Sequence, residues 1–325
     1  MTHDVPQATQ TARTAQTAEL LPGCHVMGLT PFTRRGDLDE GALREHTRRL
    51  ADENLGFWPA SPATGEGAQM SDAEIFRTLE IVVEEAAGRV PVIASGLEFP
   101  TAALNIAYMK EARQRGADAV QLYPPTLGHS SVPSPEMLER FYDEVLSSAD
   151  TPVVLSSNQM TGFEVPAAVL DRPIAEHPQV AGVFKNHPDQ QNIADFVTRF
   201  APRTTVLTML QRLLFAAPAG AKGVLDNLQN VAPRLSRTFY DALLRGDLAA
   251  TGDAYRTLTA LWGEITGFSA ARSAPRVVVY KAMLRILGLP GGHPRRPYVD
   301  LGDQALRELA RIIDAVGLRE AEGLV

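Results

Sequence analysis

The chain has 325 residues, of which 45% are hydrophobic and 21% charged, a balance typical of a folded globular protein rather than a disordered one. A formal net charge of −7, with no run of basic residues longer than a pair such as Arg34-Arg35, argues against a nucleic-acid partner. The one cysteine, Cys24, excludes an internal disulfide and fits the reducing cytoplasm, where we expect the protein to act. The sequence contains no run of 18 apolar residues, the length that would predict a membrane span, so we expect no membrane partner.

Residues 1–22 differ in composition from the rest of the chain. They are rich in Thr, Gln and Ala and lack the apolar run of a secretory signal. We expect a disordered tail over 1–22.

From Cys24 onward, short apolar runs alternate with longer amphipathic segments. The apolar runs are four to six residues or so in length, are rich in Val, Leu and Ile, and predict strands at 25–29, 57–60, 90–95, 119–123, 152–156, 180–184, 204–208 and 223–225. The amphipathic segments predict helices at 39–54, 71–87, 101–115, 134–148, 166–176, 189–200, 211–219 and 232–244. Ser71 and Glu74 have the spacing of a capping box at the start of one of these helices.

Eight strand–helix units predict parallel strands with right-handed crossovers, and eight such units close into a TIM (β/α)8 barrel. A doubly wound open sheet is the alternative, but the segment after the first strand, 29–33, has no glycine-rich phosphate loop. After residue 244 the pattern predicts three helices, at 248–266, 274–287 and 303–316. We therefore expect an α/β fold with a barrel at 23–246 and a C-terminal three-helix extension at 247–325.

A TIM barrel carries its chemistry at the carboxyl ends of its strands, so the polar residues there are site candidates. Lys185 is the most informative, because it follows the uncharged run 180–184. Burial lowers the pKa of a lysine, and the neutral amine can attack a carbonyl to form a Schiff base. The resulting iminium is an electron sink that permits carbon–carbon cleavage or dehydration beside a ketone. A lysine that ends a strand and reaches water is the structural alternative.

Several segments, in their order along the chain, also match a known family. The matching segments are 29–32, 36–39, 63–66, 88–94, 116–120, 220–224, 230–233, 281–282, 287–292 and 296–297. With these motifs, the chain resembles the dihydrodipicolinate synthase and N-acetylneuraminate lyase superfamily of class I aldolases.

This resemblance implies that Lys185 is the Schiff-base lysine and that Thr64 helps to bind the carboxylate of an α-keto acid. Ala63 and Gly65 flank Thr64 in a turn whose backbone N–H groups we expect to form an anion nest. Glu66 is expected to close that turn by hydrogen bonds to backbone. The resemblance also implies a small-molecule α-keto acid as substrate and a homo-oligomer, either a dimer or a tetramer.

The chain departs from the family pattern where the family has its proton-relay hydroxyls. Ala63 and Leu127 stand at two of these positions, and Ser156 stands where a tyrosine is usual at the end of the fifth strand. The segment leading to Lys185 is one residue longer than the usual Gly-hydrophobic-Lys pattern. We expect His187 to serve as the replacement acid–base group, since histidine titrates near neutrality.

Further candidates complete the predicted site. Ser156, Ser157 and Asn158 are expected to orient substrate or water, and Asp226, at the end of the last strand, to contact substrate. No metal-ligand spacing and no nucleotide fingerprint occur in the sequence, so we expect no cofactor. The loss of hydroxyls predicts a substrate less polar than a sugar.

The predicted activity is that of a Schiff-base lyase or aldolase acting on pyruvate or another α-keto acid, with a substrate different from that of lysine biosynthesis. A hydratase or dehydratase of the same superfamily shares the iminium intermediate and stays open. A third possibility is an inactive barrel that only binds a keto acid or a partner.

Overall fold

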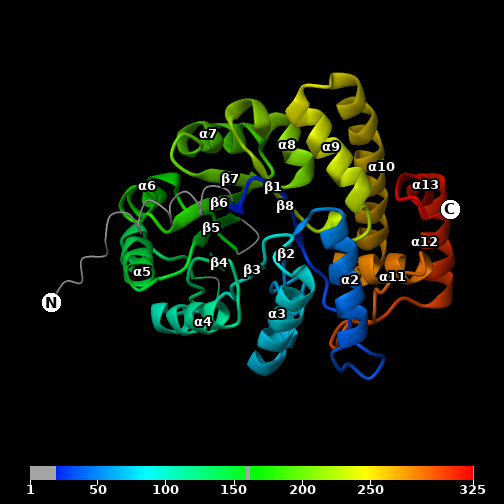
Figure 1. Ribbon diagram of the computed structural model, residues 1–325, viewed down its shortest axis with the longest axis horizontal. Coiled ribbons are helices and arrows are strands. Elements are labelled where there is room, and N and C mark those ends of the chain that lie inside the picture. The colour runs from blue at the N-terminus through cyan, green and yellow to red at the C-terminus, as the bar shows by residue number, and fades with distance from the viewer. Residues whose placement is uncertain (1–19, 130, 159–161, 325) are drawn as a thin grey trace. The chain divides into compact units, whose positions relative to one another are not determined.

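The computed structural model describes residues 20–129, 131–158 and 162–324 (Figure 1). The prediction of a disordered tail therefore falls almost entirely outside the described residues. Within the tail range, Leu21 is fully buried and lies against the positions of Gly182 and Gly223. In the described part of the chain no helix is long and apolar enough to cross a membrane.

All eight predicted strands are present and belong to one parallel sheet. They are β1 Gly23–Met27, β2 Gly56–Trp58, β3 Ile93–Ala94, β4 Ala119–Leu122, β5 Val153–Asn158, β6 Val180–Asn186, β7 Thr205–Thr208 and β8 Gly223–Asp226. The strand order is β2-β1-β8-β7-β6-β5-β4-β3. Each strand is followed by a helix, which is the arrangement of the predicted (β/α)8 barrel with additional C-terminal helices.

The described part of the chain divides into two compact units, and the first consists of its residues up to 23 and from 96 to 224. It contains β4 to β7 and the start of β8, with the helices α4 Ala102–Gln114, α5 Pro135–Ser147, α6 Ala167–Glu176, α7 Gln190–Phe200 and α8 Leu210–Ala216 and the 3-10 turn η3 Ala217–Ala219. Thr101, Ser134 and Asp189 cap α4, α5 and α7 by accepting backbone N–H hydrogen bonds at their first turns.

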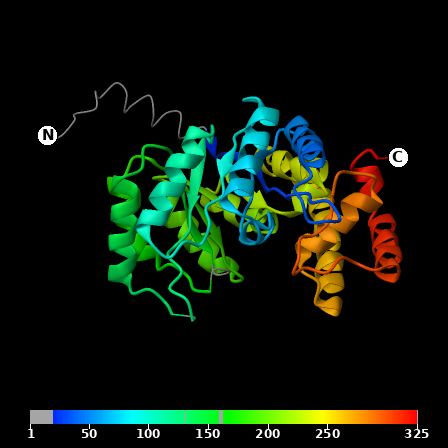
Figure 2. The same ribbon diagram turned by 90° about the horizontal axis from the view of Figure 1, so that it is seen from below.

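The second unit consists of residues 24–95 and 225–325. It contains most of β1, then β2, β3 and the end of β8. Its helices are α2 Glu40–Asp52, η1 Gly67–Gln69, α3 Asp72–Ala86, η4 Leu228–Asn230, α9 Pro233–Arg245, α10 Leu248–Arg272, α11 Arg276–Ile286, α12 Asp303–Ala315 and α13 Leu318–Ala321. Helices α10, α11 and α12 pack against one another, as the gold-to-red ribbons of Figure 2 show.

Three local differences from the sequence-based expectation occur, and the first two have clear causes. The second strand ends at Trp58 because Ala60 adopts a left-handed backbone with φ of 54°. Helix α10 continues past 266 to Arg272 and ends where Ser273 takes the left-handed conformation ahead of Pro275. The short helix α13 follows the three predicted C-terminal helices.

Candidate functional site

Lys185 lies at the carboxyl end of β6 and is completely buried. In the pairing of β5 with β6, Lys185 is level with Ser157, and Phe184 is level with Ser156. Paired residues of parallel strands point to the same face, and successive residues point to opposite faces. Lys185 and Ser157 therefore share one face of the sheet, and Ser156 lies on the other face with Phe184.

The face that carries Lys185 is the one covered by α7. Its Nζ lies 4.9 Å from the ring centroid of Phe196, a buried residue of that helix. From Gly182 to Asn186 the pairing of β6 has no irregularity, so the one-residue extension after Gly182 moves the lysine to the opposite face. The structure thus brings Lys185 to a strand end, as predicted, but not onto the same face as Ser156.

The partner of Lys185 is Glu164, a residue that the sequence analysis missed. Glu164 lies in the segment between β5 and α6, and its Oε1 forms an ion pair with Lys185 Nζ. Its Oε2 lies 3.4 Å from His187 Nε2. The carboxylate therefore joins the two residues that the sequence did predict, Lys185 and His187. The acidic residue between β5 and α6 was the available signal, but its separation of 21 residues from Lys185 hid the pairing.

His187 has a defined tautomer in this arrangement. Its Nδ1 accepts the backbone N–H of Asp189 at 3.0 Å, so the ring proton belongs on Nε2, which faces Glu164. The side chain is 15% exposed. His187 therefore presents an N–H donor to Glu164.

Burial and the ion pair act on the pKa values of the cluster in opposite directions. Burial lowers the pKa of Lys185 below its ordinary value, and the hydrogen bond and charge of Glu164 only partly oppose this shift. For Glu164 burial raises the pKa, but the hydrogen bond and charge of Lys185 outweigh it, so that the pKa is lowered. Lys185 and Glu164 therefore form an ion pair whose amine loses its proton more readily than that of an ordinary lysine.

Two buried hydroxyl groups flank Lys185 on the neighbouring strands. Ser157 of β5 is level with Lys185, and Thr208 of β7 lies one residue beyond Leu207, the partner of Phe184. By alternation both share the face of Lys185. Within the part of the chain that the structure describes, neither hydroxyl has a hydrogen-bond partner. These two hydroxyls are therefore unpaired polar groups on the buried face that carries Lys185.

Asn158, a predicted substrate contact, ends β5 and is partly exposed. Its Oδ1 accepts a hydrogen bond from Asn186 Nδ2 at 3.4 Å, between residues that are level in the sheet. Alternation places this pair of amides on the face opposite Lys185 and Ser157. Asn158 therefore holds the ends of β5 and β6 together.

The predicted carboxylate loop lies in the second unit, after β2. Thr64 and Gly65 are buried, while Ala63 is exposed. Gly65 is obligatory, because a Cβ there would lie 2.4 Å from the backbone N of Ser61. The N–H of Gly65 donates to Ser61 Oγ at 2.9 Å.

The N–H groups that follow in the same turn are also used internally. Glu66 N–H donates to the carbonyl of Ala63, and Gly67 N–H donates to the carbonyl of Ser61. Together with the N–H of Gly65, these donors are not available to form the expected anion nest. An anion at this loop would have to be bound by other groups of the turn, such as Thr64.

Glu66 is fully buried and does bind backbone, but not that of its own turn. Its Oε1 accepts the N–H of Arg295 at 2.7 Å, and its Oε2 forms an ion pair with Lys281. Burial lowers the pKa of Lys281 to about 8, against the charge of Glu66. Lys281 also donates to the carbonyl of His293 at 3.0 Å. This cluster ties the turn after β2 to α11 and the segment that follows it.

Asp226, the last predicted site residue, has a structural role in the same unit. Its Oδ1 accepts the N–H groups of Asn227 at 2.6 Å and Leu228 at 3.1 Å. The side chain is fully buried. Asp226 therefore fixes the turn that follows β8.

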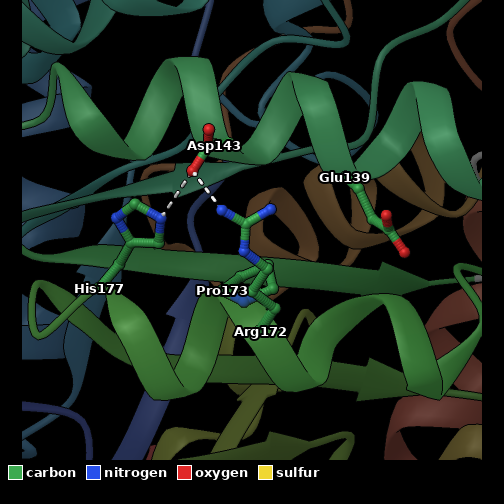
Figure 3. A pocket seen from close by; sticks show the side chains of 5 residues that line it. All are labelled: Glu139, Asp143, Arg172, Pro173 and His177. Atoms are coloured by element: carbon green, nitrogen blue, oxygen red, sulfur yellow. Dashed lines mark ion pairs between the residues drawn. The ribbon is translucent and has the colours of Figure 1, made fainter.

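A small surface pocket occurs elsewhere in the first unit, between α5 and α6. Figure 3 shows His177 and Arg172 directed at Asp143, with Oδ1 of Asp143 at 3.5 Å from both side chains. Glu139 and Pro173 complete its lining. His177 precedes β6, so the pocket lies at the amino end of that strand, whereas catalytic groups of this fold lie at the carboxyl ends. Among the described residues, no group of three His, Cys, Asp or Glu side chains could hold a metal ion.

Comparison with known proteins gives a consistent result. Residues 21–316 match the model of the dihydrodipicolinate synthetase family. An uncharacterized DapA-like lyase of Rhizobium meliloti is 26% identical over 86% of this chain and 91% of its own. A 4-hydroxy-tetrahydrodipicolinate synthase of Sorangium cellulosum is 31% identical over 89% of this chain and 94% of its own. Among solved structures, YagE of E. coli K12, a dihydrodipicolinic acid synthase family protein crystallised in complex with pyruvate, shares the fold with a TM-score of 0.82 at 22% identity, covering 91% of this chain and 99% of its own.

Proposed function

The chain belongs to the dihydrodipicolinate synthetase family, a family of class I lyases, and we propose that it forms a Schiff base with pyruvate or another α-keto acid through Lys185. The observation that carries this proposal is the buried amine of Lys185 at the end of β6, in contact with Glu164. A lyase is also what the name of the Rhizobium relative indicates for that protein.

The small number of lysines supports Lys185 as the reacting amine. The sequence contains four lysines. Lys110 and Lys222 are exposed, and Lys281 is held by Glu66 and a backbone carbonyl. Lys185 is the lysine that combines burial with the carboxyl end of a strand, where this fold carries its chemistry. Its lowered pKa increases the fraction of neutral, nucleophilic amine.

Once the iminium has formed, its positive nitrogen withdraws electrons from the neighbouring carbons. Cleavage of the bond between the β and γ carbons of the keto acid then leaves an enamine instead of an unstable carbanion. The same intermediate would serve in the opposite direction, with the enamine adding to an aldehyde. After loss of a proton from the β carbon, the resulting enamine can also expel a hydroxyl from the γ carbon of the keto acid, so the hydratase or dehydratase reading shares the first step.

The role of the loop after β2 stays a prediction. From the resemblance to the family, we expect Thr64 to bind a substrate carboxylate together with Ala63 and Gly65. Thr64→Val keeps the size of the buried side chain and removes its hydroxyl. We expect this change to raise KM for the keto acid more than it lowers kcat.

A second candidate function is keto-acid binding without imine chemistry, and one observation favours it. Phe184 occupies the position two residues after Gly182, where the family pattern has its lysine, and Lys185 lies on the opposite face of β6. In this reading Lys185 and Glu164 form a structural ion pair beneath α7.

We further propose that the protein acts in the cytoplasm as a homo-oligomer, either a dimer or a tetramer. Its single cysteine and the family resemblance support this proposal. Light scattering on the purified chain measures the molar mass. A mass equal to that of one chain would contradict the oligomer.

Reductive trapping separates the two candidate functions. The protein is incubated with pyruvate and, in parallel, with short aliphatic and aromatic α-keto acids, then treated with borohydride and weighed by mass spectrometry. An imine former retains one keto-acid unit per chain as a stable amine, and Lys185→Ala retains none. A protein that binds the keto acid in calorimetry but gains no mass after reduction supports the second function.

A further inference from the structure

We propose that Glu164 is the catalytic acid–base residue of imine formation and takes the place of the family's missing hydroxyl relay. This inference rests on the proposed function, since it concerns the protons of the Lys185 amine. Glu164 is in direct contact with the reacting nitrogen, through the ion pair of its Oε1 with Lys185 Nζ.

The position of Glu164 suits proton transfer between the buried amine and its surroundings. Lys185 has a side-chain exposure of 1%, whereas that of Glu164 is 30%. The carboxylate therefore connects an enclosed amine with solvent. Asn192 of α7 donates a side-chain hydrogen bond that helps to hold it in place. On its other side the amine faces the ring of Phe196, which accepts no proton.

The two acid–base candidates beside Lys185 differ in their free lone pairs. In His187 the Nδ1 lone pair accepts the N–H of Asp189, and Nε2 carries the ring proton. The imidazole thus has no free lone pair for a proton from Lys185. Glu164 has lone pairs on both oxygens, and its charged neighbours are Lys185 and, at 3.4 Å, His187 when protonated. His187 is therefore a positioning residue, whose N–H is directed at the second oxygen of Glu164.

Imine formation can be written with every proton accounted for. The ammonium of Lys185 gives one proton to Glu164, and the neutral amine adds to the ketone. The N–C bond forms while the carbonyl π pair moves to oxygen. A second proton passes from nitrogen to that oxygen, and Glu164 returns the first proton to the same oxygen. The C–O bond then breaks, water leaves, and the nitrogen lone pair forms the C=N bond. Two of the three ammonium protons thus leave in the water, and the product is the protonated imine.

The test measures how fast the full-length protein forms its reducible adduct with pyruvate, by adding borohydride at successive times. We expect Glu164→Gln to slow adduct formation roughly a hundredfold, a typical loss when an acid–base group is removed. Glu136→Gln is the matched control, because Glu136 is exposed on α5 and pairs only with Arg140 in the described contacts. We expect its rate to equal that of the unchanged protein.

Chemical rescue distinguishes proton transfer from a structural role of the ion pair. Glu164→Ala leaves space for a small acid, and the partial exposure of Glu164 gives access to it. We expect formate to restore the rate of Glu164→Ala in proportion to its concentration, and chloride at equal ionic strength to have no effect. A thermal melt of each variant confirms that it is folded.

The possible outcomes are distinct. If the unchanged protein forms no adduct, both the proposed function and the role of Glu164 are wrong. If it forms the adduct and Glu164→Gln does so at the same rate, only the role of Glu164 is wrong. A slowed variant that responds equally to formate and chloride overturns the role as well, because the carboxylate then acts only through its charge.

Discussion

Ser156 and Ser157 are neighbours in β5, but they point to opposite faces of the sheet. The hydroxyl of Ser157, which has no hydrogen-bond partner among the described residues, lies level with Lys185, so we expect it to hydrogen-bond the oxygen of a keto acid at that amine. We expect Ser157→Ala to slow adduct formation about tenfold, the usual loss for one hydrogen bond to a charged or polarised group.

Ser156→Ala is the natural control for that change, since both serines are fully buried. Its adduct rate should stay within about twofold of the unchanged protein, because its hydroxyl is on the far face from Lys185. Equal losses in the two variants, or a larger loss in Ser156→Ala, would show that the substrate approaches the face of Phe184 instead.

His187 offers a second comparison at the same scale. His187→Gln keeps an N–H donor for Glu164, whereas His187→Ala removes it. With a positioning role, we expect turnover to fall only a few-fold in His187→Gln and about tenfold in His187→Ala, the value of one charge-assisted hydrogen bond. His177→Gln, on the pocket between α5 and α6, serves as the control. A hundredfold loss in His187→Gln would instead make His187 the acid–base group, as the sequence suggested.

At the scale of elements, the start of α3 shows how one carboxylate joins distant segments. Ser71 and Glu74 form the predicted capping box, with the N–H of Ser71 donating to Glu74 Oε2 at 2.9 Å. The same oxygen accepts from Arg295 Nη1 at 2.8 Å. Arg295 comes from the segment after α11, so the cap also holds that segment. The hydrogen bond from Arg295 is the main cause that lowers the pKa of Glu74 to about 2.

This lowered pKa gives a prediction about stability. The folded protein holds Glu74 ionised below the ordinary pKa of 4.5, so its contribution is complete above pH 4.5 and is lost as the pH falls toward 2. We expect Glu74→Gln to reduce the free energy of unfolding by about 1–2 kcal/mol at pH 7, after allowance for solvent screening.

The measurement is urea unfolding of both proteins between pH 7 and pH 2.5. The difference in free energy of unfolding between the unchanged protein and Glu74→Gln should be constant above pH 4.5 and shrink below it. The exposed pair of Glu136 with Arg140 supplies the control variant, Glu136→Gln, which should differ little from the unchanged protein at any pH. A Glu74→Gln difference that does not change with pH would contradict the lowered pKa.

Most of the strands and helices could be predicted from the sequence, whereas the details of the candidate site could not. Hydrophobic runs of the right length, bounded by Gly and Pro, located every strand to within a few residues, because burial on both faces leaves a continuous apolar signal. Helix starts such as Ser71 were predictable from local capping chemistry. The face on which Lys185 lies was not predictable, because it depends on the regular pairing of β6 after Gly182. Glu164 was missed because a single acidic residue between two elements resembles any solvated charge until its partner is known.

The whole molecule has the fold of its family, but the position of its buried lysine differs from the family pattern. The chain has the fold, the strand order and the matched length of a class I lyase family. Its buried lysine, however, lies one position further along β6 than the family pattern has it. We propose that Lys185, assisted by Glu164, still forms the imine from this position.

Peptide mapping of the trapped adduct tests this claim most directly. The protein is reduced with borohydride in the presence of pyruvate, digested, and searched for modified peptides at each of its four lysines. We predict modification of the peptide that contains Lys185 and its loss in Lys185→Ala. An adduct on Lys110, Lys222 or Lys281, or a fully folded protein that gains no adduct with any keto acid tested, would contradict the role of Lys185.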